Sequence, residues 1–281
     1  MSPPPNDQNK KKDITTASGP LNLLRPFLLL SYSAIYIFPT IIHLVCSFQW
    51  GAFFSFAEFK EHWFSRFWAF FGPKSRDFAA PVVLPLLERN ATGVCLDIGP
   101  GTGQWLSVFG RAHNPTITKI YGVEPNRGMH ALLRQQAAEA GLSDVYEVIG
   151  CGAQELKTRG GIAPGSIDTI ITVQSLCSIP TPQVIIRELY PLLKPGGKWL
   201  MYEHVKTKYQ SSFVGYWQKA INLIWPHFFG GCDICRPTDE WILQAGEWED
   251  VNIVTGEGEG PYDTIPHVSG SLTKKRFEKL N

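Results

Sequence analysis

The segment at residues 94–103, VCLDIGPGTG, constrains the fold more than any other part of the chain. An apolar run ends in an acidic residue and a loop with Gly99, Gly101 and Gly103 at alternate positions. Glycine has no Cβ atom, so such a loop can turn sharply and bring its main chain against a ligand. We expect a strand over the apolar run and a helix that begins near Gln104, with its free N–H groups directed at the loop.

The spacing of these glycines differs from two common nucleotide motifs. The dinucleotide fingerprint is G-x-G-x-x-G, and here the third glycine comes one residue earlier. The phosphate-binding pattern G-x-x-x-x-G-K-S/T is absent from the sequence. The loop therefore points to another cofactor, although a plain glycine-rich turn in an α/β domain is the structural alternative.

From about residue 75 onward, strand and helix patterns alternate, which is typical of a parallel sheet covered by helices on both faces. We predict strands at residues 94–98, 119–123, 145–149, 167–172, 198–203, 251–255 and 266–272. We predict helices at residues 127–140, 182–193, 213–229 and 238–246.

Ligands of open α/β sheets bind at the carboxyl ends of the strands, and polar residues gather there in this sequence. Asp97 lies at the end of the first predicted strand. Glu124 ends the second, about 20 residues past the loop, where a carboxylate can accept hydrogen bonds from ribose hydroxyls. The other candidate cofactor-binding residues are Pro125, Met129, Gly152, Ala153, Gln154 and Gln174. Core packing is the alternative for Met129, and a solvated strand end is the alternative for Glu124.

Four segments together resemble class I S-adenosyl-L-methionine (SAM) methyltransferases: LDIGPGTG at 96–103, VEPN at 123–126, GSIDTIITVQSLCSI at 165–179 and LLKPGGKWLMYEH at 192–204. The resemblance implies a Rossmann-like α/β fold with a mostly parallel seven-stranded sheet and helices on both faces. It also implies SAM as the cofactor.

A closer resemblance is to the methyltransferase-like-seven family of membrane-anchored alkyl thiol methyltransferases. It is carried by LCSI at 176–179, EHV at 203–205, YWQ at 216–218, FFGGC at 228–232 and PHVSG at 266–270. The aromatic residues Trp217, Trp225, Phe228, Phe229 and Trp241 could line an apolar acceptor pocket, although each alone is more often a core residue.

Methyl transfer from a sulfonium requires alignment of donor and acceptor and exclusion of water, and it needs no metal. A thiol is partly ionised at neutral pH, so modest help from a base is sufficient. His204 is the first candidate for that base and Asp233 the second. The alternatives are a pocket-shaping role for His204 and a helix-cap or surface role for Asp233. Cys232 and Cys235 form a single C-x-x-C pair without a second pair, so we expect no metal site.

The N-terminal part of the chain changes composition abruptly. Residues 1–20 are polar and proline-rich, with a basic cluster at Lys10–Lys12, and predict a disordered tail. Residues 26–57 contain no Lys, Arg, Asp or Glu, and Phe27–Phe48 is close to the ~20 residues that a helix needs to cross a bilayer. Three interpretations remain open: a single span, a kinked hairpin or in-plane anchor, and a soluble cap helix over the active site. The basic residues before the segment favour a cytosolic N-terminus, and an anchor that leaves both ends cytosolic keeps the enzyme near its SAM supply.

Residues 52–71 combine aromatic and charged residues, which suits an amphipathic helix at a membrane interface or over an apolar pocket, and Pro73 is expected to end it. A helix that packs in the core is the alternative. We therefore divide the chain into a disordered tail (1–20), an apolar membrane-anchor segment (21–57), an amphipathic aromatic helix (58–74) and a SAM-dependent methyltransferase domain (75–281). We expect association with a membrane surface, of the endoplasmic reticulum or a lipid droplet, with the catalytic domain facing the cytosol. The net charge of +1 gives no indication of a nucleic-acid partner, and protein partners stay unassigned.

The function we expect is transfer of a methyl group from SAM to a small lipophilic acceptor, with a thiol favoured over other groups. One alternative is O- or N-methylation in a secondary-metabolite pathway. Another is a non-catalytic lipid-surface protein with a degenerate methyltransferase domain, against which the intact glycine loop and Glu124 argue.

Overall fold

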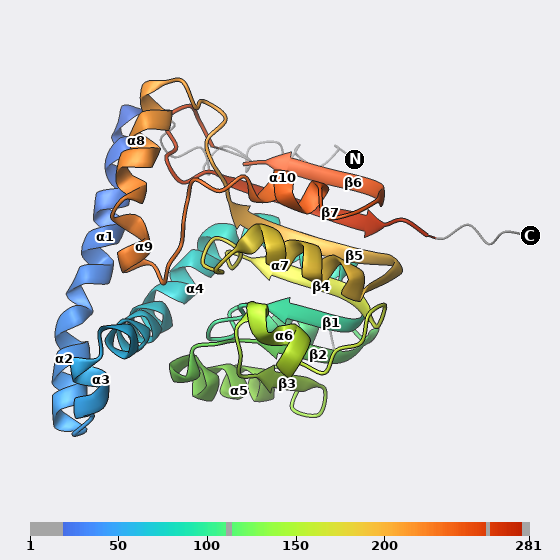
Figure 1. Cartoon of the computed structure of the whole chain (residues 1–281), viewed down its shortest axis with the longest axis horizontal. Helices are drawn as coiled ribbons and strands as arrows, with labels where there is room; N and C mark the ends of the chain where they lie inside the picture. Colours follow the sequence, from blue (N-terminus) through green and yellow to red (C-terminus); the bar gives the residue numbers. More distant parts are fainter. Residues whose placement is uncertain (1–18, 111–113, 257–258, 277–281) are drawn as a thin grey trace, which may run out of the picture.

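A seven-stranded sheet forms the centre of the computed structural model, which describes residues 19–110, 114–256 and 259–276. The strands are arranged in the order β3-β2-β1-β4-β5-β7-β6 (Figure 1). Their bounds are β1 Gly93–Ile98, β2 Ile117–Val123, β3 Tyr146–Ile149, β4 Ile167–Val173, β5 Leu193–His204, β6 Trp248–Thr255 and β7 His267–Lys274. The strands β1 to β5 pair in parallel, and β7 pairs antiparallel with both β5 and β6. The predicted α/β fold with a mostly parallel seven-stranded sheet is confirmed.

Helices cover both faces of this sheet, each through its own apolar cluster. On one face, α5 (His130–Glu139) and the last turns of α4 (Phe56–Asn90) pack on the strands through residues such as Leu133 and Leu87. On the other face lie α6 (Leu156–Arg159), α7 (Pro182–Leu189) and α10 (Thr238–Leu243). The order of the strands reverses at β1 and β4, so the loops after these two strands diverge and leave room for a ligand.

The helix expected to begin near Gln104 does not form, and that prediction was wrong. Turns follow the glycine loop, and then a short 3₁₀ helix, η2 (Leu106–Phe109). Gly110 ends this segment after too few residues for a stable α-helix. In addition, the carbonyl of Gln104 accepts a hydrogen bond from Arg76 Nε at 2.8 Å.

Pro73 does not end the aromatic helix, contrary to the prediction. The helix α4 continues through Pro73, Pro81 and Pro85 to Asn90. Each internal proline removes one hydrogen bond at a cost of about 3 kcal/mol, but α4 buries a row of apolar side chains along its whole length. This burial outweighs the local cost. As a result, α4 runs across the predicted domain boundary at 74/75 and joins the N-terminal region to β1.

The N-terminal region is helical and lies along one side of the molecule (Figure 1). It consists of η1 (Pro20–Leu24), α1 (Arg25–Ile35), α2 (Ile37–Cys46) and α3 (Trp50–Phe54). Among the described residues, one helical stretch, Pro20–Cys46, is long and apolar enough to cross a membrane. The break between α1 and α2 at Tyr36 comes three residues before Pro39, which has no N–H to donate to the preceding turn. Of the predicted tail, the structure describes only Gly19 and Pro20. The basic cluster Lys10–Lys12 lies outside the described residues.

Specific polar contacts hold α1 against the rest of the protein. Ser33 Oγ donates to the carbonyl of Phe228 at 2.7 Å, and Trp63 Nε1 donates to the carbonyl of Ser33 at 2.8 Å. Trp217 Nε1 donates to the carbonyl of Leu23 at 3.0 Å. The apolar segment at residues 21–57, which we call the leader, is therefore docked on α4 and on α9 (Trp225–Phe228). Through Trp217 it also contacts α8 (Phe213–Asn222). The helix predicted at 213–229 corresponds to α8 and α9, which are separated at Leu223.

Candidate active site

The carboxyl ends of the parallel strands open into a cavity of about 710 Å³. Its walls are the loops that follow β1 to β5, and α4 and α9 also line the cavity. This volume lies within the ~300–1,000 Å³ of typical small-molecule sites. The cavity is therefore the place to look for the predicted site residues.

The glycine loop has the backbone that its sequence predicts. Gly99, Gly101 and Gly103 have φ angles of 68°, 59° and 84°, a region that side chains with a Cβ atom rarely adopt. Gly99 and Gly101 line the cavity, and a Cβ atom on Gly101 would lie 2.7 Å from Nε1 of Trp68. Gly103 does not line the cavity but packs against Leu133 and its neighbours on α5. The third glycine thus allows the loop to pack closely on α5, on the side away from the cavity.

Two buried carboxyl groups lie beside this loop. Glu124 Oε2 accepts the N–H of Gly101 at 3.0 Å, and Oε1 accepts the N–H of Asn126 at 2.8 Å. Burial raises the pKa of Glu124 to about 7. Burial, together with the charge of Glu124, raises the pKa of Asp97 to about 7. Both groups line the cavity, where a ligand that donates hydrogen bonds or carries positive charge would favour their ionised forms.

The remaining predicted cofactor-binding residues line the same cavity: Pro125, Met129, Gly152, Ala153, Gln154 and Gln174. Met129 is buried, and the amide of Gln154 folds over Gly152 so closely that a Cβ atom there would collide with it. Gln174 has a φ angle of 53°, which is uncommon for a residue with a side chain and often marks a functional site.

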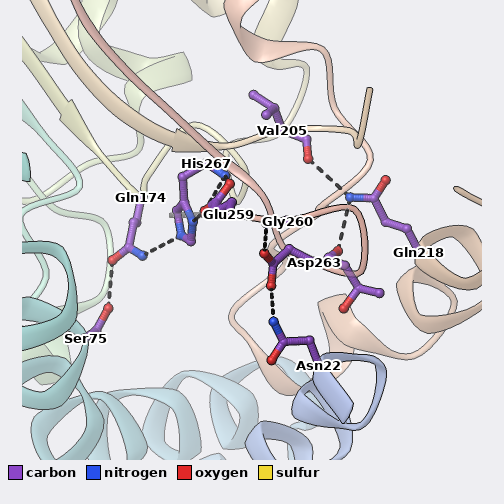
Figure 2. A network of polar contacts seen from close by, with 10 residues as sticks. Asn22, Ser75, Gln174, Val205, Gln218, Glu259, Gly260, Asp263 and His267 are labelled. Atoms are coloured by element: carbon purple, nitrogen blue, oxygen red, sulfur yellow. Dashed lines mark hydrogen bonds and ion pairs between the residues drawn. The ribbon is translucent and has the colours of Figure 1, made fainter. Parts of the chain in front are cut away.

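A chain of polar contacts orients Gln174 (Figure 2). Its Oε1 accepts from Ser75 Oγ at 2.9 Å, and its Nε2 donates to His267 Nε2 at 3.4 Å. His267 Nδ1 in turn donates to Glu259 Oε1 at 2.6 Å. Burial lowers the pKa of His267 well below its ordinary value, so the ring stays neutral and offers Nε2 as an acceptor. Sequence reasoning missed Glu259 and His267, and the only signal was the PHVSG segment that was quoted for the family resemblance.

Glu203 lies at the end of the same strand as His204 and belongs to the polar residues expected at the strand ends, but sequence reasoning assigned it no specific role. Its Oε1 accepts hydrogen bonds from the N–H groups of Ser175 and Leu176 and from Ser175 Oγ, at 3.2, 3.2 and 3.3 Å. The side chain is fully buried, and burial raises its pKa to about 7. Glu203 therefore fixes the loop after β4, which forms one wall of the cavity.

Replacement of Glu203 tests this structural role. Glu203→Ala would leave two buried N–H groups without partners, at about 1–3 kcal/mol each. We expect the free energy of unfolding to fall by about 2–6 kcal/mol in thermal or denaturant unfolding. Glu249→Ala removes an exposed pair with Arg276 and is the control, with an expected change below about 0.5 kcal/mol. Equal stability of the two variants would contradict the role of Glu203.

The two candidate catalytic residues differ in their positions. His204 lines the cavity, with its ring centroid 4.6 Å from that of His267. Asp233 lies outside the cavity lining in the described part of the chain, and its Oδ1 accepts from Asn222 Nδ2 and from the N–H of Cys235, both at 2.8 Å. The structure therefore does not bring Asp233 to the cavity, and its carboxylate instead holds the loop between α9 and α10.

One part of the cavity is aromatic, and it reaches the glycine loop, because Trp68 Nε1 lies 2.7 Å from the Cβ position of Gly101. It is lined by Trp63, Phe64, Trp68, Phe71, Trp225, Phe228 and Phe229. Of the five aromatic residues expected in an acceptor pocket, Trp217 and Trp241 lie elsewhere: Trp217 contacts η1, and Trp241 packs against the core. Phe78 and Trp105 also line the cavity. We refer to the seven residues Trp63, Phe64, Trp68, Phe71, Trp225, Phe228 and Phe229 as the aromatic lobe.

A family model described as "Methyltransferase domain" matches residues 71–239, which is more than half of the chain. The chain belongs to this family. Thiol S-methyltransferase TMT1B of Rattus norvegicus is 28% identical over 183 residues, which cover 64% of this chain and 70% of the relative. Thiol S-methyltransferase TMT1A of Homo sapiens is 24% identical over 220 residues, which cover 78% and 79%. The methyltransferase-like-seven resemblance is confirmed by these relatives.

Solved structures agree with the methyltransferase domain in fold. A SAM-dependent methyltransferase of Thermotoga maritima has a TM-score of 0.52 at 20% identity and covers 76% of this chain and 97% of its own. A methyltransferase structure from Bacillus halodurans has a TM-score of 0.53 at 14% identity, with coverage of 69% and 99%. At such identities the likeness establishes the class I fold alone. Family, fold and relatives together make this protein a SAM-dependent methyltransferase.

Proposed function

We propose that SAM binds along the wall formed by the glycine loop. In this arrangement the ribose hydroxyls donate to Glu124, and the adenine lies beside Met129 and residues 152–154. The methionine end lies near Asp97 and Gln174. The residues present fit this cofactor, because Gly99 and Gly101 take positive φ angles that bring their main chain to the cavity wall and because two buried carboxyl groups line the same cavity.

The acceptor that we propose is a small lipophilic thiol. The observation that carries this proposal is that the glycine-loop wall and the aromatic lobe line one continuous cavity. An apolar tail can fill the lobe while its sulfur faces the methyl group, which is the alignment that in-line displacement needs. The thiol S-methyltransferases among the relatives support sulfur over oxygen or nitrogen as the methylated atom.

Little further chemistry is required of the protein. SAM supplies the electrophilic methyl group, and closure of the aromatic lobe around the acceptor excludes water. A few per cent of an ordinary thiol is ionised at neutral pH, and the thiolate is the reactive form. His204 is the residue at the cavity wall that is placed to assist ionisation of the thiol.

An acceptor comparison tests the proposal. The full-length protein in detergent receives SAM with a deuterated methyl group and, separately, octanethiol, octylphenol or octylamine, which share one apolar tail. We expect the labelled thioether in mass spectrometry, with a rate at least about tenfold above that of the phenol or the amine. Labelled phenol ether or methylamine without thioether would contradict the choice of sulfur and would support the O- or N-methylation alternative.

The buried carboxyl groups predict a pH dependence of SAM binding. The pKa values of Glu124 and Asp97 are raised to about 7, so these groups are partly protonated near neutral pH before the ligand binds. The ribose hydroxyls and the cationic ligand require the ionised forms, so binding displaces protons. We expect the affinity for SAM, measured by calorimetry, to rise by up to about tenfold in total for each carboxyl group between about pH 6 and about pH 8, and to level off above the pKa of the group. Glu124→Gln removes part of this rise, and a flat profile in the unmodified protein would contradict the assignment.

We further propose that the N-terminal helices hold the enzyme at a membrane surface. Apolar side chains on α1 to α3 face outward, among them Phe38 and Phe54, which are 74% and 79% exposed. The helix α8 adds Phe213 and Tyr216, and Figure 1 shows it beside α1 on the same side of the molecule. Because the leader is also hydrogen-bonded to the catalytic domain, an anchor in the plane of the membrane fits it better than a detached span. The choice of endoplasmic reticulum or lipid droplet stays a prediction.

A further inference from the structure

Three potential metal ligands meet at one point of the cavity wall: Cys177, His204 and Cys232. Their ligand atoms all lie within 4.8 Å of one another, and Cys232 Sγ is 3.5 Å from His204 Nδ1. Cys177 lies in the loop after β4, His204 ends β5, and Cys232 follows α9. Both cysteines are buried and are free thiols. The residues come from three separate parts of the chain, so their spacing in the sequence does not predict the cluster.

The distances suit a tetrahedral zinc ion. Zinc–sulfur and zinc–nitrogen bonds of about 2.3 and 2.0–2.1 Å place tetrahedral sulfur and nitrogen ligands about 3.6 Å apart. The distance of 3.5 Å between Cys232 Sγ and His204 Nδ1 is close to this value. Two sulfur ligands of the same ion would be separated by about 3.8 Å. Cys177 Sγ lies within 4.8 Å of the other two ligand atoms, so the pair of sulfurs is compatible with this separation.

The surrounding backbone holds the three side chains together before any ion binds. The N–H of Asp233 donates to the carbonyl of Cys177 at 2.9 Å, which ties the two cysteine loops to each other. Arg236 Nη1 donates to the carbonyls of Leu176 and Ile179 at 2.6 and 2.8 Å. Glu203 fixes the same loop from the other side through the N–H of Leu176. A preformed set of ligands of this kind loses little conformational entropy on binding a metal.

We propose that Cys177, His204 and Cys232 bind Zn²⁺ and leave its fourth position open to the cavity, where the acceptor thiol coordinates as a thiolate. Three protein ligands and an open position are typical of catalytic rather than structural zinc. The inference rests on the proposed function, because it names what activates the thiol of the S-methylation reaction. His204 then acts as a metal ligand, and the ion takes over the role of the base.

The reaction balances without a further reagent. Coordination of the thiol RSH to Zn²⁺ releases its proton to solvent and leaves a zinc-bound thiolate. A sulfur electron pair forms the bond to the methyl carbon of SAM, and the carbon–sulfonium bond breaks toward the SAM sulfur. The products are the thioether RSCH₃ and neutral S-adenosylhomocysteine. The thioether is a weaker ligand than a thiolate, so it leaves the metal.

Metal content and spectroscopy test the site without reliance on activity. The full-length protein is purified in detergent under reducing conditions without chelator, and its zinc is measured by mass spectrometry. We expect about one zinc per chain. After exchange for Co²⁺, we expect sulfur-to-cobalt charge-transfer absorption that changes when octanethiol is added. Cys177→Ser, Cys232→Ser and His204→Asn should each weaken zinc binding by more than about 100-fold, because loss of a ligand costs more than loss of its supporting contacts.

The matched control is Cys235→Ala, three residues from Cys232 and outside the group of three ligands. This variant should keep its zinc, and binding of S-adenosylhomocysteine by every variant reports that the fold is intact. A reduced, folded protein that binds neither Zn²⁺ nor Co²⁺ overturns the inference, as does a Cys177–Cys232 disulfide that persists in the reductant. Thiol methylation without metal leaves the proposed function standing and overturns the zinc site alone. If zinc is bound but only phenols are methylated, both the proposed thiol acceptor and the proposed activation of a thiol by zinc are overturned.

Discussion

Gly101→Val is expected to abolish SAM binding, with a loss of affinity of more than about 100-fold, or about 2.7 kcal/mol. Gly101 has a φ angle of 59°, where a residue with a Cβ atom costs about 1–2 kcal/mol and a β-branched residue costs more. The new side chain would also collide with Trp68, since its Cβ atom would lie 2.7 Å from Nε1. Calorimetry with S-adenosylhomocysteine measures the loss.

A second glycine separates this effect from backbone strain alone. Gly141 has a φ angle of 70°, and a Cβ atom there would have no neighbour within 4 Å. Gly141→Val therefore carries similar strain at the end of α5, away from the cavity, and should lower stability while it leaves the affinity for S-adenosylhomocysteine unchanged. Normal cofactor binding by folded Gly101→Val protein would place the cofactor elsewhere.

The double substitution Phe38→Glu/Ile42→Glu should release the protein from membranes. The two side chains lie one helical turn apart on α2 and are 74% and 61% exposed, so they contribute little to the folded core. Insertion of each side chain into the membrane interface would contribute about 1.5–3 kcal/mol to the free energy of membrane binding. A carboxylate in its place opposes insertion. We expect the fraction bound in liposome flotation to fall by more than about 100-fold, with methylation of a soluble thiol retained.

The matched control for membrane release is Val184→Glu. Val184 is 52% exposed on α7, which packs on the sheet away from the N-terminal helices. This variant should remain bound to liposomes. If the double variant also floats with the liposomes, the in-plane anchor is contradicted. If the unmodified protein does not bind them, the anchor is contradicted as well, and the cap-helix interpretation is favoured.

The strands and the glycine loop were predictable because local sequence determines them. The apolar run predicts a buried strand, the alternating glycines permit the positive φ angles of the loop that follows, and Glu124 could be found by its spacing from that loop. The helix near Gln104 and the end of the aromatic helix at Pro73 were predicted wrongly because contacts with distant segments determine the structure at these two places. Arg76 captures the carbonyl of Gln104 from a distant helix, and burial along α4 overrides the proline.

The parts of the site that sequence reasoning missed depend on contacts between distant segments. Glu259 is linked to Gln174 only through His267 on β7, which makes a hydrogen bond to each of them. Cys177 and Cys232 are 55 positions apart, and the C-x-x-C spacing drew attention to Cys235 instead. In each case the chemistry arises from strand order, which a local pattern does not encode.

A crystal structure with bound S-adenosylhomocysteine tests the central claim most directly. We predict the ribose on the carboxylate of Glu124, the main chain of Gly99 and Gly101 against the ligand, and the sulfur directed into the aromatic lobe. Ligand density away from the glycine loop, or a sulfur atom that faces solvent instead of the lobe, would contradict the account.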